Sequence, residues 1–571
     1  MTLEFGSVGC DYRDRRRQGA RLLVPQNCFV ISSDRPGDLT QPKMAGYANS
    51  ETAVVLGRQG LVQYLAAGHP GADLREGRFF GVFPEKGVTR IRTDRTGQEQ
   101  MFLFQIESFW AISNSFILLA SYVAKSHRLT IYPPALFSFH LKSGRHIGEQ
   151  LVSHNTPISG IRMIPATTNI AIDHKTGSLS LEHRDFFEVF GGAHYQDLLL
   201  EFLQSRVRLL ATFGNFKRRM NLFLSGGYDS RVVLGMMLKS GVEEALDITS
   251  RETQTADFRA AKPLVEALGL QLNRDRERPA SLASPLDSQR LWLLSCGGTY
   301  LPFYRVGSYL SDADATIKLT GDQPTSWDHF IGRAKFNGTA AKIADDIKDD
   351  LKDRAPGADV AADFLSVFSD IGVEPDHPKA MLAHYWAIRS RHHCGRHWYK
   401  SLGASRLVTP LTHSHWVSFE FSDNTASLSP KQAFADIFSA LDIPELWHPF
   451  ETRDHAFEPE LLQNSPFKGG VALDNAPLSV FGDLTEPCDG PMSMMDLPVP
   501  AKSSDTEMKT QLAHTFWMAE RARESGVFSE GDIARAKAEI AEDGPLSTSF
   551  RKVSHFAMTE AILAIVEGSG P

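Results

Sequence analysis

Apolar and β-branched residues gather in short runs between turn-forming residues over residues 1–190. Runs of this length and composition are typical of β-strands. One longer stretch, residues 51–67, instead repeats its apolar residues at helical spacing. The pattern therefore predicts a β-rich region over residues 1–192 that helices interrupt. The clearest strand candidates are residues 21–24, 28–32, 100–104 and 169–172.

The pattern changes near residue 195, where predicted strands and helices begin to alternate. Residues 195–213 carry apolar side chains at helical spacing. Alternation of strands and helices is typical of a parallel sheet whose strands are joined by crossover helices. The elements that follow are predicted strands at 221–224, 245–250 and 317–320, and predicted helices at 231–240 and 257–270.

The C-terminal part of the chain is predicted to be mainly helical. Residues 465–510 are rich in Pro, Gly, Ser and Asp and indicate a loop. The most apolar stretch, residues 109–124, contains several Ser and Asn residues and is too short to span a membrane. The predicted helices cover residues 340–358, 380–400, 511–541 and 549–567.

Composition narrows the class of protein. The 571 residues are 42% hydrophobic and 22% charged, and the net charge of −8 argues against broad nucleic-acid binding. The five cysteines form no CxxC pair, so neither a disulfide framework nor a zinc site is indicated. Residues 1–9 lack the pattern of a secretory signal. We expect a soluble, cytoplasmic protein without nucleic-acid or membrane partners.

The hexamer Ser225–Gly226–Gly227–Tyr228–Asp229–Ser230 follows the apolar residues 222–224 and precedes a predicted helix. Its glycines allow a close backbone approach, and its N–H groups can bind an anion together with the helix N-terminus. Two serine hydroxyls add donors, and Asp229 can hold Mg²⁺. Taken alone, the run also fits a simple capped helix start. It is not a Walker loop, because the Gly-x-x-x-x-Gly-Lys pattern is missing.

This hexamer resembles the pyrophosphate-binding loop (PP-loop) of the N-type ATP pyrophosphatases. With Tyr228 and Arg231, it is most similar to the asparagine-synthetase family. The resemblance implies an α/β fold, with an adenine-nucleotide α-hydrolase-like, parallel-sheet synthetase domain over residues 193–571 that binds ATP and Mg²⁺. The residues it assigns to nucleotide binding are Leu224, Ser225, Gly226, Gly227, Asp229, Ser230, Ile248 and Gly321.

The resemblance continues beyond the loop. Asp257 matches the family's acidic residue near the start of the next helix, and Thr320–Gly321 matches the start of its Ser-Gly-x-Gly-x-Asp segment. The spacing to the final Asp differs, and an ungapped match puts Thr325 at that position. The second carboxylate for Mg²⁺, beside Asp229, is therefore Asp328 or Asp322.

The N-terminal region is similar to the family's glutaminase domain at residues 93–102, 111–115 and 156–165. This implies a degenerate Ntn-hydrolase-like αββα sandwich over residues 1–192. The family's nucleophilic cysteine would follow Met1, where this chain has Thr2. Thr2 is an alternative nucleophile, whereas Cys10 and Cys28 are internal. We expect no ammonia production from glutamine.

Members of this family that lack glutaminase activity include β-lactam synthetases and lasso-peptide cyclases. The resemblance thus implies an AMP-forming carbon–nitrogen ligase that adenylates a carboxylate and couples it to an amine from a source other than glutamine. The substrate would be a small molecule or a peptide, and partner proteins of a biosynthetic pathway are compatible with this. The alternatives are a glutamine-hydrolysing asparagine synthetase and a non-catalytic nucleotide-binding relative.

The attacking amine needs a base or an orienting group. Tyr385 and His384 lie on a predicted helix in the region where the family places its base, and Lys468 is a candidate for a late catalytic lysine. His393 and His397 are four residues apart, which favours a basic helix face and leaves a metal site as an alternative.

Overall fold

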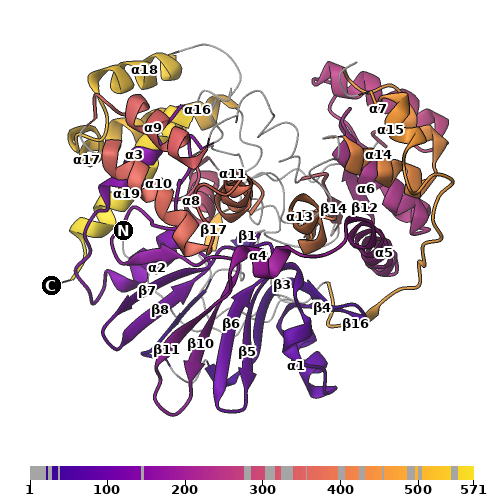
Figure 1. Cartoon of the computed structure of the whole chain (residues 1–571). Helices are drawn as coiled ribbons and strands as arrows, with labels where there is room; N and C mark the ends of the chain where they lie inside the picture. The colour runs from indigo at the N-terminus through magenta and orange to yellow at the C-terminus, as the bar shows by residue number, and fades with distance from the viewer. Residues whose placement is uncertain are drawn as a thin grey trace.

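The computed structural model of the chain describes residues 21–23, 29–35, 39–142, 147–274, 285–301, 316–322, 339–354, 357–395, 406–422, 431–452, 456–484, 496–498, 505–541 and 551–570. These residues form a mixed α/β protein with several sheets, one of which is parallel throughout (Figure 1). Two sheets lie in the N-terminal region, the parallel sheet lies in the C-terminal region, and a two-stranded ribbon joins β1 (Arg21–Leu23) to β17 (Asp496–Pro498).

The N-terminal region contains a seven-stranded sheet and a four-stranded sheet. In sheet order, the seven strands are β11 (Leu179–His183), β10 (Thr168–Asp173), β6 (Val88–Thr93), β5 (Glu76–Glu85), β3 (Lys43–Asn49), β4 (Ala53–Leu56) and β16 (Ser479–Phe481). The four strands are β2 (Val30–Ser32), β8 (Phe109–Ser113), β7 (Phe102–Ile106) and β9 (Ile161–Met163).

The two sheets face each other across a hydrophobic core. Alternate residues of β6 are buried, as expected for a strand with one face on a core. Ile91 and Ile170 from one sheet meet Trp110 and Ile112 from the other. Helix α1 (Gly57–Ala66) packs on the outer face of the larger sheet, and α2 (Phe116–Val123) packs against the smaller one. The result is four layers in the order helix, sheet, sheet, helix.

Two segments differ from the predicted pattern. The helix predicted over residues 51–67 begins only at Gly57, because Ala53–Leu56 is a fully buried apolar run that pairs with β3 instead. The predicted loop over residues 465–510 contributes β16, which pairs in parallel with β4. The C-terminal part of the chain therefore completes the N-terminal sheet.

The parallel sheet has the order β13 (Leu246–Thr249), β12 (Met220–Phe223), β14 (Ile317–Leu319) and β15 (Arg406–Val408). All three adjacent pairs are parallel, which confirms the predicted sheet type and adds a fourth strand. Helix α5 (Tyr195–Gly214) precedes β12, α6 (Tyr228–Lys239) follows it, and α7 (Thr255–Ala267) follows β13. The strand order reverses between β12 and β14, and ligands of open α/β sheets bind at such switch points.

The remaining helices flank these sheets. Figure 1 shows α14 and α15 beside α6 and α7, whereas α9, α10 and α16 to α19 gather on the opposite side of the molecule. The helix predicted over 340–358 divides into α9 and α10, and that over 380–400 includes a π-helix, Tyr385–Ser390. The other helices are α3 (Pro133–Ser138), α4 (Phe186–Phe190), α8 (Pro285–Cys296), α9 (Ala340–Asp350), α10 (Gly357–Asp370), α11 (Ala380–His384), α12 (Arg391–His393), α13 (Ser414–Phe421), α14 (Gln432–Leu441), α15 (Pro459–Gln463), α16 (Asp505–Met518), α17 (Glu520–Glu524), α18 (Glu530–Ala541) and α19 (Arg551–Glu567).

The apolar stretch at residues 109–124 forms β8 and α2 and lies largely in the core. Across the described ranges, the helices are either too short or too polar to traverse a bilayer.

Candidate functional site

The loop of residues 225–230 lies at the carboxyl end of β12, at the switch point of the parallel sheet. The Leu224 N–H donates to Thr249 O at 2.9 Å, which fixes the loop beside the end of β13. Within the loop, the Ser225 N–H donates to Ser230 Oγ at 3.0 Å, and the two serine hydroxyls are 3.0 Å apart. The loop is therefore closed by its own serines, and both hydroxyls already have hydrogen-bond partners.

The two glycines make the close contacts that their small size allows. The Gly226 N–H donates to Asp257 Oδ1 at 2.8 Å, from the first turn of α7. Gly227 is the last residue before α6. A Cβ atom added to Gly226 would lie 2.4 Å from Glu451 Oε2, which is too close for a carbon atom. The position therefore requires glycine as long as Glu451 keeps this place.

The loop after β14 lies directly on the start of α6. A Cβ atom on Gly321 would come within 2.5 Å of the Ser230 N atom and 2.9 Å of Asp229 Cβ. The neighbouring Asp322 accepts a hydrogen bond from Thr320 Oγ1 at 2.9 Å. The structure thus brings Gly321 and Asp322 to Asp229, as the sequence predicts for two of its candidates. Asp328, the other candidate for the second carboxylate, lies outside the described residues.

The surroundings of Asp229 disfavour its charged form. Its Oδ1 atom is buried and has no hydrogen-bond partner among the described residues. Burial raises the pKa of Asp229 well above its ordinary value, and the nearby carboxylates of Asp322 and Glu451 raise it further. A buried carboxylate oxygen without a partner, beside a second carboxylate, is suited to a hard cation such as Mg²⁺.

Mg²⁺ usually takes only one or two carboxylates from a protein and completes its shell with water and substrate phosphates. Among the residues that the structure describes, no three His, Cys, Asp or Glu side chains are arranged to hold a metal ion by themselves. Asp229 and Asp322 would therefore hold Mg²⁺ together with oxygen atoms of a bound ligand.

Arg231 binds residues 446–451, a segment that is distant in sequence, next to the loop. Its guanidinium donates to Leu446 O at 3.2 Å and to Pro449 O at 2.8 Å, and it lies 4.0 Å from the ring centre of Phe450. These contacts bring Glu451 to the glycines. Sequence reasoning missed Glu451, because no motif surrounds it and its position depends on a contact between distant parts of the chain.

Ile248 is buried in β13, and its carbonyl accepts a hydrogen bond from the Asn273 N–H at 2.9 Å. Asn273 also pairs with Ser250 through two hydrogen bonds of 2.9 Å, one from the Ser250 N–H and one from its own side-chain amide to the Ser250 carbonyl. The end of the second strand is thus held rigidly beside the loop.

The two neighbouring residues proposed as bases lie in different surroundings. Tyr385 is buried in the π-helix, and burial raises its pKa well above 10, with the charges of Cys394, Glu420 and Asp229 adding to the effect. His384 Nε2 lies 2.9 Å from Val152 O and donates to it, and burial lowers the pKa of His384 to about 4. Tyr385 is thus within electrostatic reach of Asp229, whereas His384 hydrogen-bonds to the N-terminal region.

Lys468 is exposed in the loop that follows α15. The chain just after it packs against Asp442, at the C-terminal end of α14. At this end of α14, Leu441 packs on Gly235 of α6. Gly235 lies seven residues after Tyr228, which places it about 10 Å along the helix axis from the loop. The structure does not bring Lys468 to the loop.

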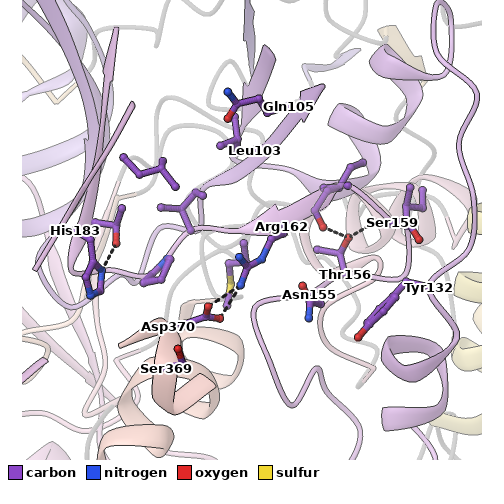
Figure 2. Close-up of a pocket in the computed structure, with 18 residues that line it drawn as sticks. Leu103, Gln105, Tyr132, Asn155, Thr156, Ser159, Arg162, His183, Ser369 and Asp370 are labelled. Carbon is purple, nitrogen blue, oxygen red and sulfur yellow. Dashed lines mark hydrogen bonds and ion pairs between the residues drawn. The ribbon is translucent and has the colours of Figure 1, made fainter. Parts of the chain in front are cut away.

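A cavity of about 730 Å³ lies elsewhere, between β7, β9, β10, β11 and the end of α10 (Figure 2). Its charged groups pair with each other, since Arg162 donates to Asp370 at 2.7 Å and Asp370 lies 3.0 Å from His154 Nδ1. None of the residues that line it belongs to the loops at the ends of the parallel strands. We therefore place the candidate active site at the loop of residues 225–230.

The metal alternative at His393 and His397 stays a prediction. His393 Nδ1 lies 2.8 Å from the Tyr300 hydroxyl, and His397 lies outside the described residues, as do Thr2, Cys10 and Cys28.

No family model matches the chain, and no curated protein matches it. The class of function is therefore inferred from the geometry of the site and from the sequence motifs.

Proposed function

We propose that the protein is an ATP-dependent enzyme that binds the nucleotide phosphates on the loop of residues 225–230. More specifically, we propose an AMP-forming carbon–nitrogen ligase of the asparagine-synthetase type. The observation that carries the proposal is Asp229, whose buried Oδ1 atom has no partner among the described residues and faces further carboxylates at a glycine-rich switch-point loop.

The proposed reaction begins with attack of a substrate carboxylate oxygen on the α-phosphorus of ATP. Pyrophosphate leaves, an amine attacks the acyl carbon, and AMP leaves. The first N–H groups of α6 have no partner within the helix and suit the phosphate oxygens. Mg²⁺ bound by Asp229 and Asp322 would neutralise phosphate charge. The bond from Gly226 to Asp257 and the serine pair hold the loop in shape.

Tyr385 is proposed to orient the reacting groups as a hydrogen-bond donor. Because burial raises its pKa well above 10, the hydroxyl keeps its proton at neutral pH. His384 is a poor base for the same step, because burial lowers its pKa to about 4. The substrate amine would therefore lose its proton to another group or to water.

The N-terminal region is proposed to be a degenerate Ntn-hydrolase-like scaffold. Its helix–sheet–sheet–helix layering supports this assignment. Asn114, which the resemblance over residues 111–115 aligns with a Glu of the asparagine-synthetase family, has a structural contact, because its Oδ1 atom accepts the Phe29 N–H at 3.3 Å. We propose that the amine belongs to a peptide or small-molecule substrate and is not ammonia released from glutamine.

The test is AMP and pyrophosphate formation from ATP and Mg²⁺ by the full chain, supplied with extract of its source cells. Asp229→Asn is the inactive variant, and Glu243→Gln, which changes an exposed acid outside the site, is the matched control. We expect AMP from the wild type and from Glu243→Gln only. Equal AMP from Asp229→Asn would refute the proposal.

Parallel reactions with glutamine or ammonium in place of extract identify the amine. AMP formation that depends on glutamine would assign the protein to the glutamine-hydrolysing alternative. ATP binding without AMP under every condition would instead indicate the non-catalytic relative.

A further inference from the structure

A carboxylate of the chain lies on the glycine face of the proposed phosphate loop. The Glu451 N–H donates to Gly226 O at 3.4 Å, so the backbone at Glu451 runs alongside the loop. A Cβ atom built on Gly226 would lie 2.4 Å from Glu451 Oε2, and one built on Gly227 would lie 3.7 Å from Glu451 Oε1. Both glycines therefore have the same carboxylate above them.

Glycines in phosphate-binding loops leave this space open so that phosphate oxygens can approach the backbone. In this structure the space over Gly226 holds Glu451 Oε2 together with Glu451 Cβ, which would lie 2.6 Å from the added atom, and Glu451 Oε1 lies at ordinary contact distance from Gly227. A carboxylate resembles part of a phosphate in being a compact anion with hydrogen-bond-accepting oxygens. Glu451 thus takes the position of a ligand anion on the loop.

The charge of Glu451 acts on the same groups that would meet a polyphosphate. It raises the pKa of Asp229, together with burial and Asp322, and it also raises that of Arg231 against the lowering effect of burial. Two like charges in contact repel each other, and the repulsion is stronger in a partly buried site than in bulk water. Pyrophosphate and the Glu451 carboxylate therefore cannot share the loop without strong repulsion.

We propose that Glu451 is the resident anion of this loop, that it competes with pyrophosphate, and that its return speeds pyrophosphate release after adenylation. The inference rests on the proposed function. The Glu451 carboxylate leaves the loop when its side chain turns away, while Arg231 holds the carbonyls of Leu446 and Pro449 in place. The ligand class is an inorganic or nucleotide-derived polyphosphate bound with Mg²⁺.

The test is calorimetric titration of the full chain with inorganic pyrophosphate in the presence of Mg²⁺. We expect Glu451→Gln to lower the pyrophosphate Kd at least tenfold, because it removes the charge and keeps the shape. Glu451→Asp keeps the charge and should stay within threefold of the wild type. Glu445→Gln removes a charge from the same segment outside the loop and should change nothing.

The outcomes separate this inference from the proposed function. If the wild type binds pyrophosphate and Glu451→Gln binds it equally or more weakly, with an unchanged thermal midpoint, the competition is refuted and the proposed function stands. If pyrophosphate binds neither protein, both ideas fail. Binding to Glu451→Gln alone supports both. If Glu451→Gln lowers the thermal midpoint, Glu451→Ala is titrated in its place, and the same decrease in the pyrophosphate Kd is expected.

Discussion

Replacing Asp229 by Asn should stabilise the ligand-free protein while abolishing its proposed activity. Burial, reinforced by Asp322 and Glu451, raises the pKa of Asp229 well above its ordinary value, so the charged form is unfavourable in the folded protein. An unsatisfied buried polar group costs about 1–3 kcal/mol. Asn keeps the shape and a polar amide but removes the charge and its repulsion by the neighbouring acids. Because leaving a charged group unsatisfied costs more than leaving a neutral one, we expect Asn to raise the stability by about 1–3 kcal/mol above the folded-state pKa.

The sign of the pH dependence follows from linkage. The folded-state pKa of Asp229 exceeds the unfolded value of about 3.9. The penalty is therefore fully present above the folded-state pKa and disappears as the pH falls below the unfolded one. Thermal unfolding without ligand should give Asp229→Asn a higher midpoint than the wild type at pH 8, and the gap should close near pH 4.

Asp247, a buried acid with an ion-pair partner, is the control for Asp229. Asp247 accepts from Arg219 Nε at 3.2 Å, and Asp247→Asn should lower the midpoint at pH 8. Mg²⁺ with pyrophosphate should raise the midpoint of the wild type and leave that of Asp229→Asn unchanged. A midpoint for Asp229→Asn below that of the wild type at pH 8 would show that the Asp229 charge is already satisfied in the free protein.

Three further predictions concern Gly226, Arg231 and His384. Gly226→Ala should abolish AMP formation and displace Glu451, because its Cβ atom would lie 2.4 Å from Glu451 Oε2; activity equal to the wild type would contradict this contact. Arg231→Ala should lower stability by about 3 kcal/mol, since it removes charged hydrogen bonds and the contact with Phe450, and chemical unfolding measures the loss. His384 has a pKa lowered to about 4, so its neutral form contributes stability above pH 6.5 that is lost as the pH falls from 6.5 toward 4. His384→Gln should flatten the thermal midpoint over that range, and an unchanged slope would assign the acid sensitivity to other groups.

The parallel sheet and its loop could be predicted from the sequence because their signals are local. The apolar run before Ser225, the two glycines and the helical spacing after Ser230 lie within one short segment. The confirmed strands β12, β13 and β14 differ from their predicted ranges only at their ends. The structure also brings Gly321 to Asp229, two residues that the family resemblance assigns to one site.

Features that depend on distant contacts could not be predicted in this way. β16 is the short run Ser479–Phe481 in a loop-like segment, and it becomes a strand through its pairing with the edge of β4. The π-helix at Tyr385–Ser390 has no distinctive sequence pattern. Glu451 reaches the loop through Arg231, whose charge in the sequence does not reveal the carbonyls it binds.

The polar groups of the loop divide into two sets. Ser225 and Ser230 satisfy each other, and the Gly226 N–H is bound to Asp257, so these groups give the loop its shape. Asp229 is different, because its buried Oδ1 atom has no partner among the described residues while other acids raise its pKa. Folding alone would favour a neutral residue at this position. A charged residue there fits the common conflict between stability and function at active sites. An unfavourable charge beside groups that hold the loop in shape is what a site for a cation and a phosphate ligand requires, and this contrast is the physical basis of the proposed function.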